Sequence, residues 1–600
     1  MNLSGWKEDE NRVVRLSLLR LIPDDADLAR QWNALVQRLP QPQVFYTYEW
    51  ALAVHRAYPL ELRPLLYLAY DEENSLCGIA ALANDPEGKV SFLCATTGDY
   101  CDFLSLPEHK REFVSAVLEE LCAQGFEQIT LTNLPADSGT VEALERVAER
   151  NGYGCFARPA YECAQVALDR LQRRPGENRP VLPRKKMLRR FLNAMGRETP
   201  VRLDHARSFE AIEPILPEFI HAHIARFLLT GRISNMARQE RRVFLRELAK
   251  LLAPSGFLAL TRMMTDRAFA WNYGFQFQGT WFWYQPTFDS DLEKYSPGFC
   301  LLAKLIEEAS EDPAIKVVDL GLGAEEYKER FANQTRETLC VTLRASGLQL
   351  MREVLRYRAA NLVKTSPRIE TALRAGAKRL GQFRTKVKAQ GAASALGDLM
   401  KRCGAALGSK TEVFFFDGCS VSSANPRNAR LQPIDLALLT SAVMRYIDDE
   451  ATLDYLVRAA SRLREGKSEG FALVDVEGAL VHFAWVTAFN GFFLSELNDS
   501  VETPSPDAVM LFDCWTPASV RGQGHYAQAI SLIAKRMIER ARKPWIFSAA
   551  RNVASVRGIE KAGFQRRYSL ARRQILGWQT VTGAARQPTV VSAEEASARV

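Results

Sequence analysis

The sequence has few of the residues that bind metal ions, and those it has are scattered. Its 600 residues include 11 cysteines and only 7 histidines. No two cysteines are spaced as C-x-x-C, and the two closest histidines, His221 and His223, are two residues apart. A structural zinc site usually needs paired cysteines or histidines at fixed spacings. We therefore expect no metal site.

Long apolar runs are also missing. No segment approaches the roughly 20 apolar residues that span a bilayer. The first residues, MNLSGWKEDENRVVRL, lack the continuous apolar run of a secretory signal. An odd number of cysteines without such a signal favours a reducing compartment. We expect a cytoplasmic protein, with peripheral membrane association as an open alternative.

What the sequence does contain is enough apolar residues, 47%, to bury several cores. Its length is too great for one core and predicts roughly three or four domains. We expect a first stretch at 1–165, a second at 180–345, a basic helical linker at 346–409, a C-terminal domain at 410–580 and a tail at 581–600. The predicted fold class is α/β, with mixed, mostly antiparallel sheets flanked by helices.

Hydrophobic periodicity places the main elements of these stretches. In the first we expect strands at 64–70, 76–82, 89–94 and 128–132 and helices at 25–38 and 108–124. In the second we expect helices at 183–196, 208–228, 237–252 and 298–310 and strands at 256–263, 268–277, 280–287 and 315–320. In the fourth we expect strands at 412–416, 470–476, 479–487, 491–497, 508–516, 545–549 and 564–577 and helices at 433–447, 451–464, 524–542 and 552–562. The second and fourth stretches thus share one plan without a residue-level repeat.

Positive charge is concentrated in one segment. Residues 344–410 contain 15 Lys or Arg and 3 Asp or Glu, a local charge of +12 in a chain of net charge +8. A basic amphipathic helix of this kind is typical of contact with a membrane surface. A plain solvated linker is the alternative, and the segment shows no nucleic-acid-binding signature, so no DNA partner is expected.

A strand followed by a glycine-containing turn stands out in the fourth stretch. Apolar residues 508–516 precede Val520-Arg521-Gly522-Gln523-Gly524-His525-Tyr526, which opens a helix. A helix N-terminus has unpaired N–H groups and a positive partial charge, which favour a phosphate. Glycines let the backbone approach it closely. The pattern predicts a pyrophosphate cradle, whereas the plain alternative is an ordinary helix that starts at a glycine.

A second motif follows about thirty residues later, Asn552-x-x-Ser555 and then Lys561-Ala562-Gly563-Phe564. Together the two motifs resemble the GNAT acyltransferase superfamily over roughly 410–580. The resemblance implies acetyl-CoA, or another acyl-CoA, as cofactor. It also implies that the backbone of Cys514, Trp515 and Thr516 pairs with the pantetheine arm of the cofactor, and that Asn552 and Ser555 belong to the cofactor site.

The catalytic residues of this domain are less clear from the sequence. The chemistry needs a base for the nucleophile and often a tyrosine that protonates the leaving thiolate. The tyrosine position of the family falls on Ile559, so the proton must come from water or from another residue, for which we consider Tyr526 or Tyr568. Asp513 and Glu496 are the candidate bases, because burial in an apolar strand would raise their pKa. The alternative for both is an outward-facing strand residue.

The first two stretches carry further short motifs. Tyr295-Ser296-Pro297-Gly298 opens a helix, Gly98-Asp99-Tyr100-Cys101-Asp102 lies in the first stretch, and Asp319-Leu320-Gly321-Leu322-Gly323 precedes Tyr327-Lys328. With the basic helix at 184–190, they resemble the CelD/BcsL acetyltransferases of cellulose biosynthesis. The resemblance implies two GNAT-like halves, as in FemAB-type aminoacyl transferases, and an exopolysaccharide or cell-envelope role.

From these motifs we take Asp99, Asp102, Tyr295, Gly298, Tyr327 and Lys328 as candidate substrate residues. Asp99 and Asp102 could instead be capping residues of loops, and Lys328 could stabilise a sheet edge. The aromatic run at 281–284 could form a platform for a sugar or part of the sheet core.

The sequence therefore predicts an acyl-CoA-dependent N-acetyltransferase or acyltransferase that acts on an amine or hydroxyl of a small-molecule or saccharide acceptor. One alternative is FemAB-like aminoacyl transfer, which would require tRNA. Another is a biosynthetic scaffold without catalysis.

Overall fold

Three modules with one order of elements follow each other along the chain. The computed structural model describes residues 15–172, 180–183, 185–323, 325–364, 408–421, 429–575 and 578–583. Each module has a strand, two helical segments, antiparallel strands, a helix, a strand, a helix and a final strand. The first two modules belong to one unit (1–226 and 238–365) and the third to another (227–237 and 366–600).

The first module confirms every predicted strand and helix and adds several. Its elements are β1 (Arg15–Leu19), α1 (Ala26–Arg38), α2 (Tyr48–Ala57), β2 (Arg63–Tyr70), β3 (Leu76–Asn84), β4 (Val90–Phe92), β5 (Leu104–Ser105), α3 (Pro107–Ala123), β6 (Gln128–Pro135), α4 (Thr140–Arg150) and β7 (Gly154–Ala167). Helix α1 begins where the Asp25 carboxylate accepts hydrogen bonds from the backbone N–H groups of Asp27 and Leu28.

The second module has an additional helix, α5, before its first strand. Its elements are α5 (Lys185–Met195), β8 (Arg202–Ala206), α6 (Phe209–Ile212), α7 (Leu216–Leu229), α8 (Gln239–Leu252), β9 (Leu258–Met264), β10 (Ala268–Phe277), β11 (Thr280–Phe288), α9 (Pro297–Glu311), β12 (Val317–Leu322), α10 (Glu326–Glu329) and β13 (Gln334–Arg344). The helix predicted at 208–228 is two helices, because Pro214 cannot continue the first one. In the basic segment, α11 (Gly347–Lys364) is described, whereas 365–407 lie outside the described residues.

The third module matches the predicted elements closely. They are β14 (Gly408–Asp417), β15 (Ala429–Pro433), α14 (Leu436–Arg445), α15 (Glu450–Glu465), β16 (Glu469–Asp475), β17 (Leu480–Ala488), β18 (Phe492–Leu494), β19 (Asp499–Val501), β20 (Ala508–Trp515), α16 (His525–Glu539), β21 (Lys543–Ala549), α17 (Val553–Lys561), β22 (Gln565–Ile575) and β23 (Trp578–Gly583). The strand predicted at 491–497 is the first part of a small hairpin, β18–β19, with a turn at its centre.

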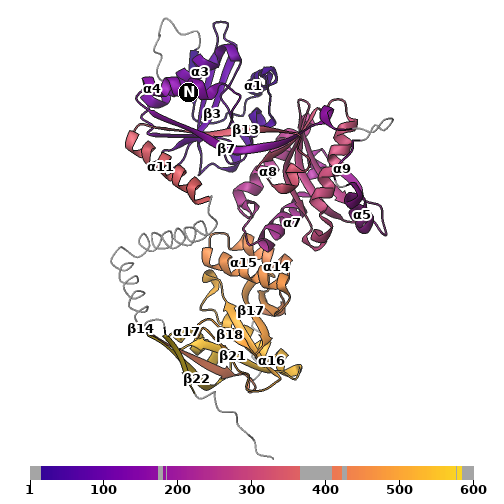
Figure 1. Ribbon diagram of the computed structural model, residues 1–600, viewed down its shortest axis with the longest axis vertical. Coiled ribbons are helices and arrows are strands. Elements are labelled where there is room, and N and C mark those ends of the chain that lie inside the picture. Colours follow the sequence, from indigo (N-terminus) through magenta and orange to yellow (C-terminus); the bar gives the residue numbers. More distant parts are fainter. Residues whose placement is uncertain are drawn as a thin grey trace, which may run out of the picture. The chain divides into compact units, whose positions relative to one another are not determined.

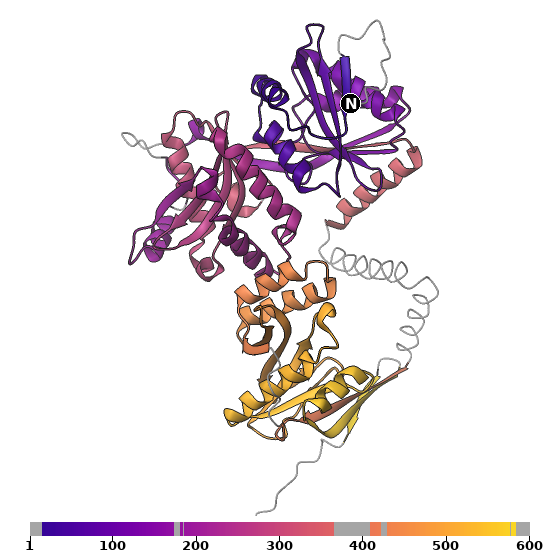
Figure 2. The ribbon, with the colours of Figure 1, turned by 180° about the vertical axis from the view of Figure 1, so that it is seen from behind.

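The first two modules exchange strands and so share one sheet. Its order is β1-β2-β3-β4-β6-β13-β7-β12-β11-β10-β9-β8, with β5 paired to β3. Strand β13 of the second module lies between β6 and β7, and β7 of the first module lies between β13 and β12. Figures 1 and 2 show β7 and β13 running through the middle of this unit. Without the other module, β6 of the first and β12 of the second would each lack a neighbouring strand.

The third module repeats the strand order of the second. Its sheet is β15-β16-β17-β20-β21-β14-β22-β23, which corresponds to β8-β9-β10-β11-β12-β7-β13 in the second. In both, the fourth and fifth strands of the order are parallel. The fifth strand also pairs with a strand that comes before all the others of that sheet order in sequence, β7 beside β12 and β14 beside β21. The predicted common plan, and the α/β fold class with flanking helices, are confirmed.

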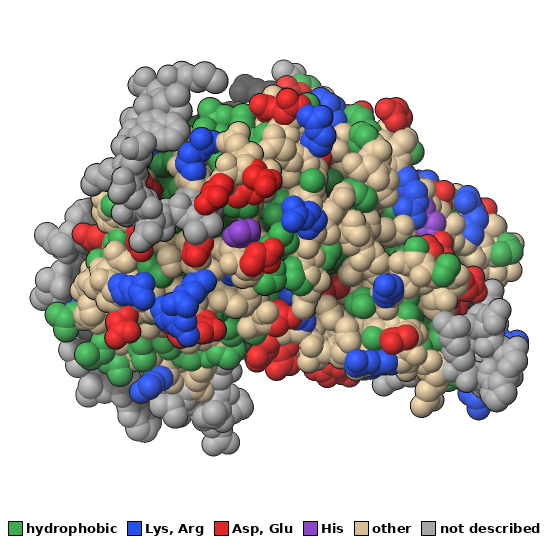
Figure 3. All heavy atoms as spheres, turned by 90° about the horizontal axis from the view of Figure 1, so that it is seen from above, with side chains coloured by type: hydrophobic (Ala, Val, Ile, Leu, Met, Phe, Trp, Pro, Cys, Tyr) green, Lys and Arg blue, Asp and Glu red, His purple; other side chains and the backbone are tan. Residues whose placement is uncertain are grey.

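Figure 3 shows one face of the molecule, on which acidic and basic side chains are interspersed. None of the described helices is long and apolar enough to cross a bilayer. Within the described ranges, His, Cys, Asp and Glu side chains form no group of three or more that could hold a metal ion.

Candidate functional site

The third module contains a fork between two parallel strands. Strand β20 pairs with β21 only from Ala508 to Leu511, although both strands continue beyond that point. On its other side β20 remains paired with β17 up to Trp515. The second half of β20 thus has one edge without a strand partner among the described residues. Backbone groups at such an edge are available to a bound extended ligand.

An irregularity in β20 lies at the fork. Asp513 has a φ of 47°, in the left-handed region, and the β17–β20 register shifts beside it. A bulge of this kind bends a strand and increases its twist. The Asp513 carboxylate forms an ion pair with Arg462 of α15, and its side chain is only 14% exposed. The predicted base therefore lies at the fork with a guanidinium partner.

The loop between β20 and α16 has the geometry of an anion cradle. Gly522 and Gly524 have φ values of 79° and 87°, which side chains other than glycine rarely adopt. Gly524 is the N-cap of α16, and neither glycine has another group within 4 Å of its missing Cβ. A phosphate can therefore approach the N–H groups of the first helical turn.

Arg521 contacts the end of β20 and the loop that follows it. Its Nε donates to the carbonyl of Thr516 at 3.0 Å, and its guanidinium lies 4.7 Å from the Trp515 ring. Trp515 also stacks on Tyr455, with ring centroids 3.9 Å apart, and its Nε1 donates to Thr452 Oγ1 at 3.0 Å. Arg521 thus fixes the path of the chain between strand and helix.

Two imidazoles beside the cradle have a buried nitrogen without a hydrogen-bond partner in the described residues. These are His482 Nε2, on β17, and His525 Nδ1, in the first turn of α16. His482 Nδ1 lies 2.8 Å from Thr516 Oγ1, and His525 Nε2 lies 3.1 Å from Gln523 Oε1. Burial, with the neighbouring His525, lowers the pKa of His482 to about 3, so this imidazole is neutral. Unpartnered buried nitrogens in a polar site are suited to a ligand or water.

Tyr526 connects the cradle to the second motif. Its hydroxyl lies 3.0 Å from Ser555 Oγ, and Asn552 caps α17 by accepting a hydrogen bond from the Ser555 N–H. A Cβ at Gly558 would lie 2.5 Å from the Tyr526 ring, so only glycine leaves room for it. Burial, with nearby Cys514, raises the pKa of Tyr526 above its usual value. Cys514 packs against the same core, where burial also raises the pKa of its thiol.

Three other residues singled out in the sequence are Ile559, Glu496 and Tyr568. Ile559 is fully buried in the core beneath α17. The apolar neighbours of Glu496 predicted a strand, but the residue lies in the β18–β19 turn. Its carboxylate accepts a hydrogen bond from Ser495 Oγ at 3.0 Å. Tyr568 stacks on Phe415, with centroids 4.7 Å apart, in a different core cluster.

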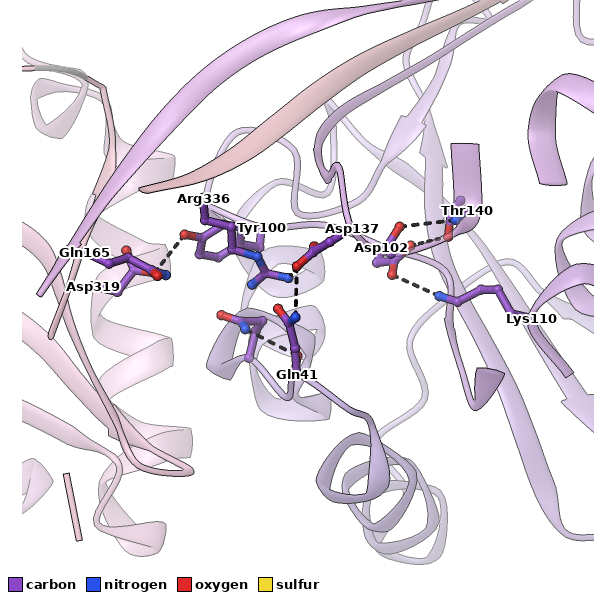
Figure 4. Close-up of polar contacts among 11 residues, drawn as sticks. Gln41, Tyr100, Asp102, Lys110, Asp137, Thr140, Gln165, Asp319 and Arg336 are labelled. Carbon is purple, nitrogen blue, oxygen red and sulfur yellow. Dashed lines mark hydrogen bonds and ion pairs between the residues drawn. The ribbon is translucent and has the colours of Figure 1, made fainter. Parts of the chain in front are cut away.

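The second module has the corresponding fork, but polar groups of the first module reach it. Strand β11 pairs with β12 only at Thr280–Phe282 with Val317–Asp319. Asp319, at the end of this pairing, is 1% exposed and accepts hydrogen bonds from Tyr100 Oη at 2.7 Å, Gln165 Nε2 at 2.7 Å and the Gly321 N–H at 2.8 Å. Figure 4 shows Tyr100 and Gln165 converging on this carboxylate, with Arg336 beside Tyr100.

Asp99 lies next to this network. A Cβ at Gly321, whose φ is 72°, would lie 2.6 Å from Asp99 Oδ2, so the carboxylate packs directly on the glycine. Burial, together with repulsion from the Asp319 carboxylate, raises the pKa of Asp99 to about 7. Lys328 and the buried Arg241 act in the opposite direction. Asp99 and Lys328 are therefore brought together in the folded unit.

We expect Asp99 to make stability depend on pH. Its folded pKa is raised, so its contribution is fully present below the unfolded pKa near 3.8 and is lost as pH rises through about 7. Relative to Asp99→Asn, the unfolding free energy of the wild type should fall by about 3 kcal/mol between pH 5 and pH 8. Urea unfolding of both proteins at the two pH values measures this difference, and parallel pH profiles would contradict it.

The remaining candidates have structural contacts. Asp102 accepts from Thr140 Oγ1 at 2.6 Å and Lys110 Nζ at 2.9 Å, which joins three segments of the first module (Figure 4). Lys328 is 6% exposed and donates to the Leu322 carbonyl at 2.9 Å. Tyr327 Oη accepts from Trp283 Nε1 at 3.3 Å.

Tyr295 and Gly298 lie elsewhere, at the start of α9. Tyr295 packs edge-on against Phe191 of α5, and Gly298 lies against the Phe288 ring. The aromatic run at 281–284 is buried in the sheet core and forms no exposed platform.

Sequence reasoning missed Arg462, His482 and Arg241. Each reaches its site from a helix or strand distant in sequence, and a single Arg or His in an amphipathic segment has no local signal. The buried guanidinium of Arg241 donates to Tyr284 Oη at 2.8 Å.

Comparisons with known proteins gave one family model and several solved structures. Residues 183–329 match the family model described as an acetyltransferase (GNAT) domain. No match to a curated protein was found. Solved structures with similar folds include L-PGS from Bacillus licheniformis (11% identity, TM-score 0.36, 55% of this chain and 96% of that chain).

Two further solved structures are similar at the same level. They are FemX (9% identity, TM-score 0.36, 52% of this chain and 95% of that one) and a tandem GNAT protein from the clavulanic acid biosynthesis pathway (14%, 0.35, 56% and 99%). The chain contains a GNAT-like acetyltransferase domain at residues 183–329.

Proposed function

We propose that this protein is an acyltransferase that binds acetyl-CoA, or another acyl-CoA, at its third module and transfers the acyl group to an amine or hydroxyl. The main support is that an open strand edge and a glycine-lined helix N-terminus lie at the two ends of one short loop. The free edge of β20 suits an extended pantetheine arm, and the start of α16 suits a pyrophosphate. A ligand with both parts in sequence is an acyl-CoA.

The residues of the third module fit such a cofactor. The backbone of Cys514 to Thr516 would hold the pantetheine arm, and Gly522 to Tyr526 the pyrophosphate. The unpartnered nitrogens of His482 and His525 offer hydrogen-bonding groups beside the same loop. When bound, the thioester would supply an activated acyl group.

Two side chains of this site have suitable proton chemistry. Tyr526 keeps its proton at neutral pH because burial raises its pKa, so its hydroxyl is a donor for a leaving thiolate. Asp513 is the better placed of the two proposed bases, since it lies at the fork whereas Glu496 lies on the β18–β19 turn. Its ion pair with Arg462 orients the carboxylate.

The acceptor can be proposed as a class of molecule. We propose a small molecule or saccharide, in exopolysaccharide, cellulose or cell-envelope biosynthesis, on the basis of the CelD/BcsL-like motifs in the first unit.

Calorimetric titration of acetyl-CoA into the full chain tests the function, followed by thiol release with glucosamine as a trial acceptor. We expect saturable binding of acetyl-CoA and thermal stabilisation that grows with its concentration. Absence of binding, together with transfer from charged tRNA, would contradict the proposal in favour of an aminoacyl transferase. Absence of both would indicate a scaffold.

A further inference from the structure

A basic groove in the first unit lies outside the sites described above. It has a volume of about 600 Å³ and is formed by α5, the turn after it and the last residue of the short 3-10 helix η5 (Ser290–Tyr295). The residues that line it are Lys186, Arg189, Arg190, Asn193, Ala194, Arg197 and Tyr295.

The helical repeat of α5 explains why so many cations share this groove. Met187, Leu188 and Phe191, with Leu192 and Met195, pack on the core of the second module. The opposite face then carries Lys186, Arg189, Arg190 and Asn193 at helical spacing, with Arg197 following. Because the apolar face of α5 is packed on the core, its basic face points towards solvent.

These cations have no neutralising partner in the part of the chain that the structure describes. Lys186, Arg189, Arg190 and Arg197 form no ion pair there. Like charges three and four residues apart on a helix destabilise it by a few tenths of a kcal/mol per pair. A bound anion would remove this repulsion, and guanidinium groups suit phosphate because they donate two hydrogen bonds in a fixed geometry.

The adjacent helix start cannot replace these side chains. Helix α9, which contacts α5, begins with Pro297, which has no N–H, after Ser296 in the left-handed region with a φ of 48°. A Cβ at Gly298 would lie 3.2 Å from the Phe288 ring. The third module offers backbone N–H groups at the equivalent point, whereas the second offers the side chains of α5.

We propose that the α5 groove binds the diphosphate of a nucleotide. The volume accommodates a nucleotide, the four basic side chains match the charge of two or more phosphates, and Tyr295 adds an aromatic residue to the lining. The groove is open to solvent, so a small ligand can reach these side chains. The nucleotide could belong to coenzyme A or to a nucleotide-activated acceptor, and this site is separate from the cradle of the third module.

Calorimetry of the full chain with ADP, UDP and tripolyphosphate tests this proposal. Each is titrated into the protein with Gly524→Val, which disables the cradle of the third module, and into the wild type. We expect binding that Arg189→Glu/Arg190→Glu weakens at least about tenfold, since two phosphate contacts are reversed. The control is Arg111→Glu/Lys316→Glu, two exposed cations of the same unit outside the groove, with the same change in net charge.

Each outcome is decisive. No binding of any of the three ligands, or equal affinity in both charge-reversal variants, overturns the proposal. Tighter binding of a single-stranded RNA oligonucleotide than of ADP overturns it in favour of a nucleic-acid site. Displacement of ADP by coenzyme A alone identifies the cofactor as the source of the diphosphate, and displacement by a UDP-sugar alone identifies an activated acceptor. If acetyl-CoA fails to bind the third module while ADP binds here, the proposed function fails and the groove stands.

Discussion

Replacing Gly524 with valine should reduce the affinity of the chain for acetyl-CoA by at least about 100-fold. Gly524 has a φ of 87°, which a β-branched residue adopts only with strain, and it is the N-cap of α16. The substitution would turn the first N–H groups of the helix away from the phosphates. No other group lies within 4 Å of the missing Cβ, and we expect the phosphates to occupy this open space. The valine side chain would fill it.

Gly478 provides the matched control. It lies in the β16–β17 turn of the same module with a φ of 81°, and no other group lies within 4 Å of its missing Cβ. Gly478→Val therefore imposes the same type of backbone strain away from the loop. Calorimetric titration of both variants separates the two effects. Unchanged affinity in Gly524→Val would show that the cradle is misassigned, and equal loss in both would show that general destabilisation is the cause.

The conformation of the loop between β20 and α16 could be predicted because its signal is local. Two glycines between an apolar strand and a helix describe a backbone conformation, and backbone conformation depends on neighbours in sequence. The same holds for Asn552, whose capping role follows from the residues after it. The contact between the Tyr526 hydroxyl and Ser555 Oγ has no such local signal, because it depends on the space that Gly558 leaves for the Tyr526 ring.

The strand exchange could not be predicted in this way. Strands β7 and β13 are about 170 residues apart at their facing ends, and each pairs with strands of the other module. The alternation of apolar and polar residues in β7 is the same whether the strand pairs within its own module or with the next one. The domain boundary at 165–180 therefore lies between two modules that share a sheet.

The Asp319 network depends on the same exchange. Tyr100 comes from the first module, Gln165 from the exchanged strand and Asp319 from the second module. The motif around Asp319 was visible in the sequence, but its partners were not, because they meet only when the shared sheet has formed. This makes Asp319 a sensitive position for the stability of the first unit.

Asp319→Ala should destabilise the first unit by about 3 kcal/mol or more. It would leave the Tyr100 hydroxyl, the Gln165 amide and the Gly321 N–H without their acceptor at a fully buried site, and each unsatisfied group costs about 1–3 kcal/mol. Removal of the repulsion on Asp99 offsets a small part of this loss, because that repulsion also holds the pKa of Asp99 up. Asp319→Asn should lower the unfolding free energy less than Asp319→Ala does, since Tyr100 can rotate its hydroxyl. Some loss should remain, because Gln165 cannot reverse its amide freely while its Oε1 accepts from Gln334 at 2.8 Å.

Hydrogen exchange of peptides from β7 and β13 during urea unfolding measures the effect in this unit separately from the third module. Asp266→Ala is the control, because Asp266 is an exposed aspartate of the same unit that accepts from Thr199 Oγ1 at 2.9 Å. Its expected cost is below about 0.5 kcal/mol. If Asp319→Ala costs no more than this control, the buried carboxylate does not hold the two modules together, and the shared sheet alone must account for their union. If β7 and β13 lose protection together, the carboxylate and the exchanged strands form one cooperative element, as their hydrogen bonds require.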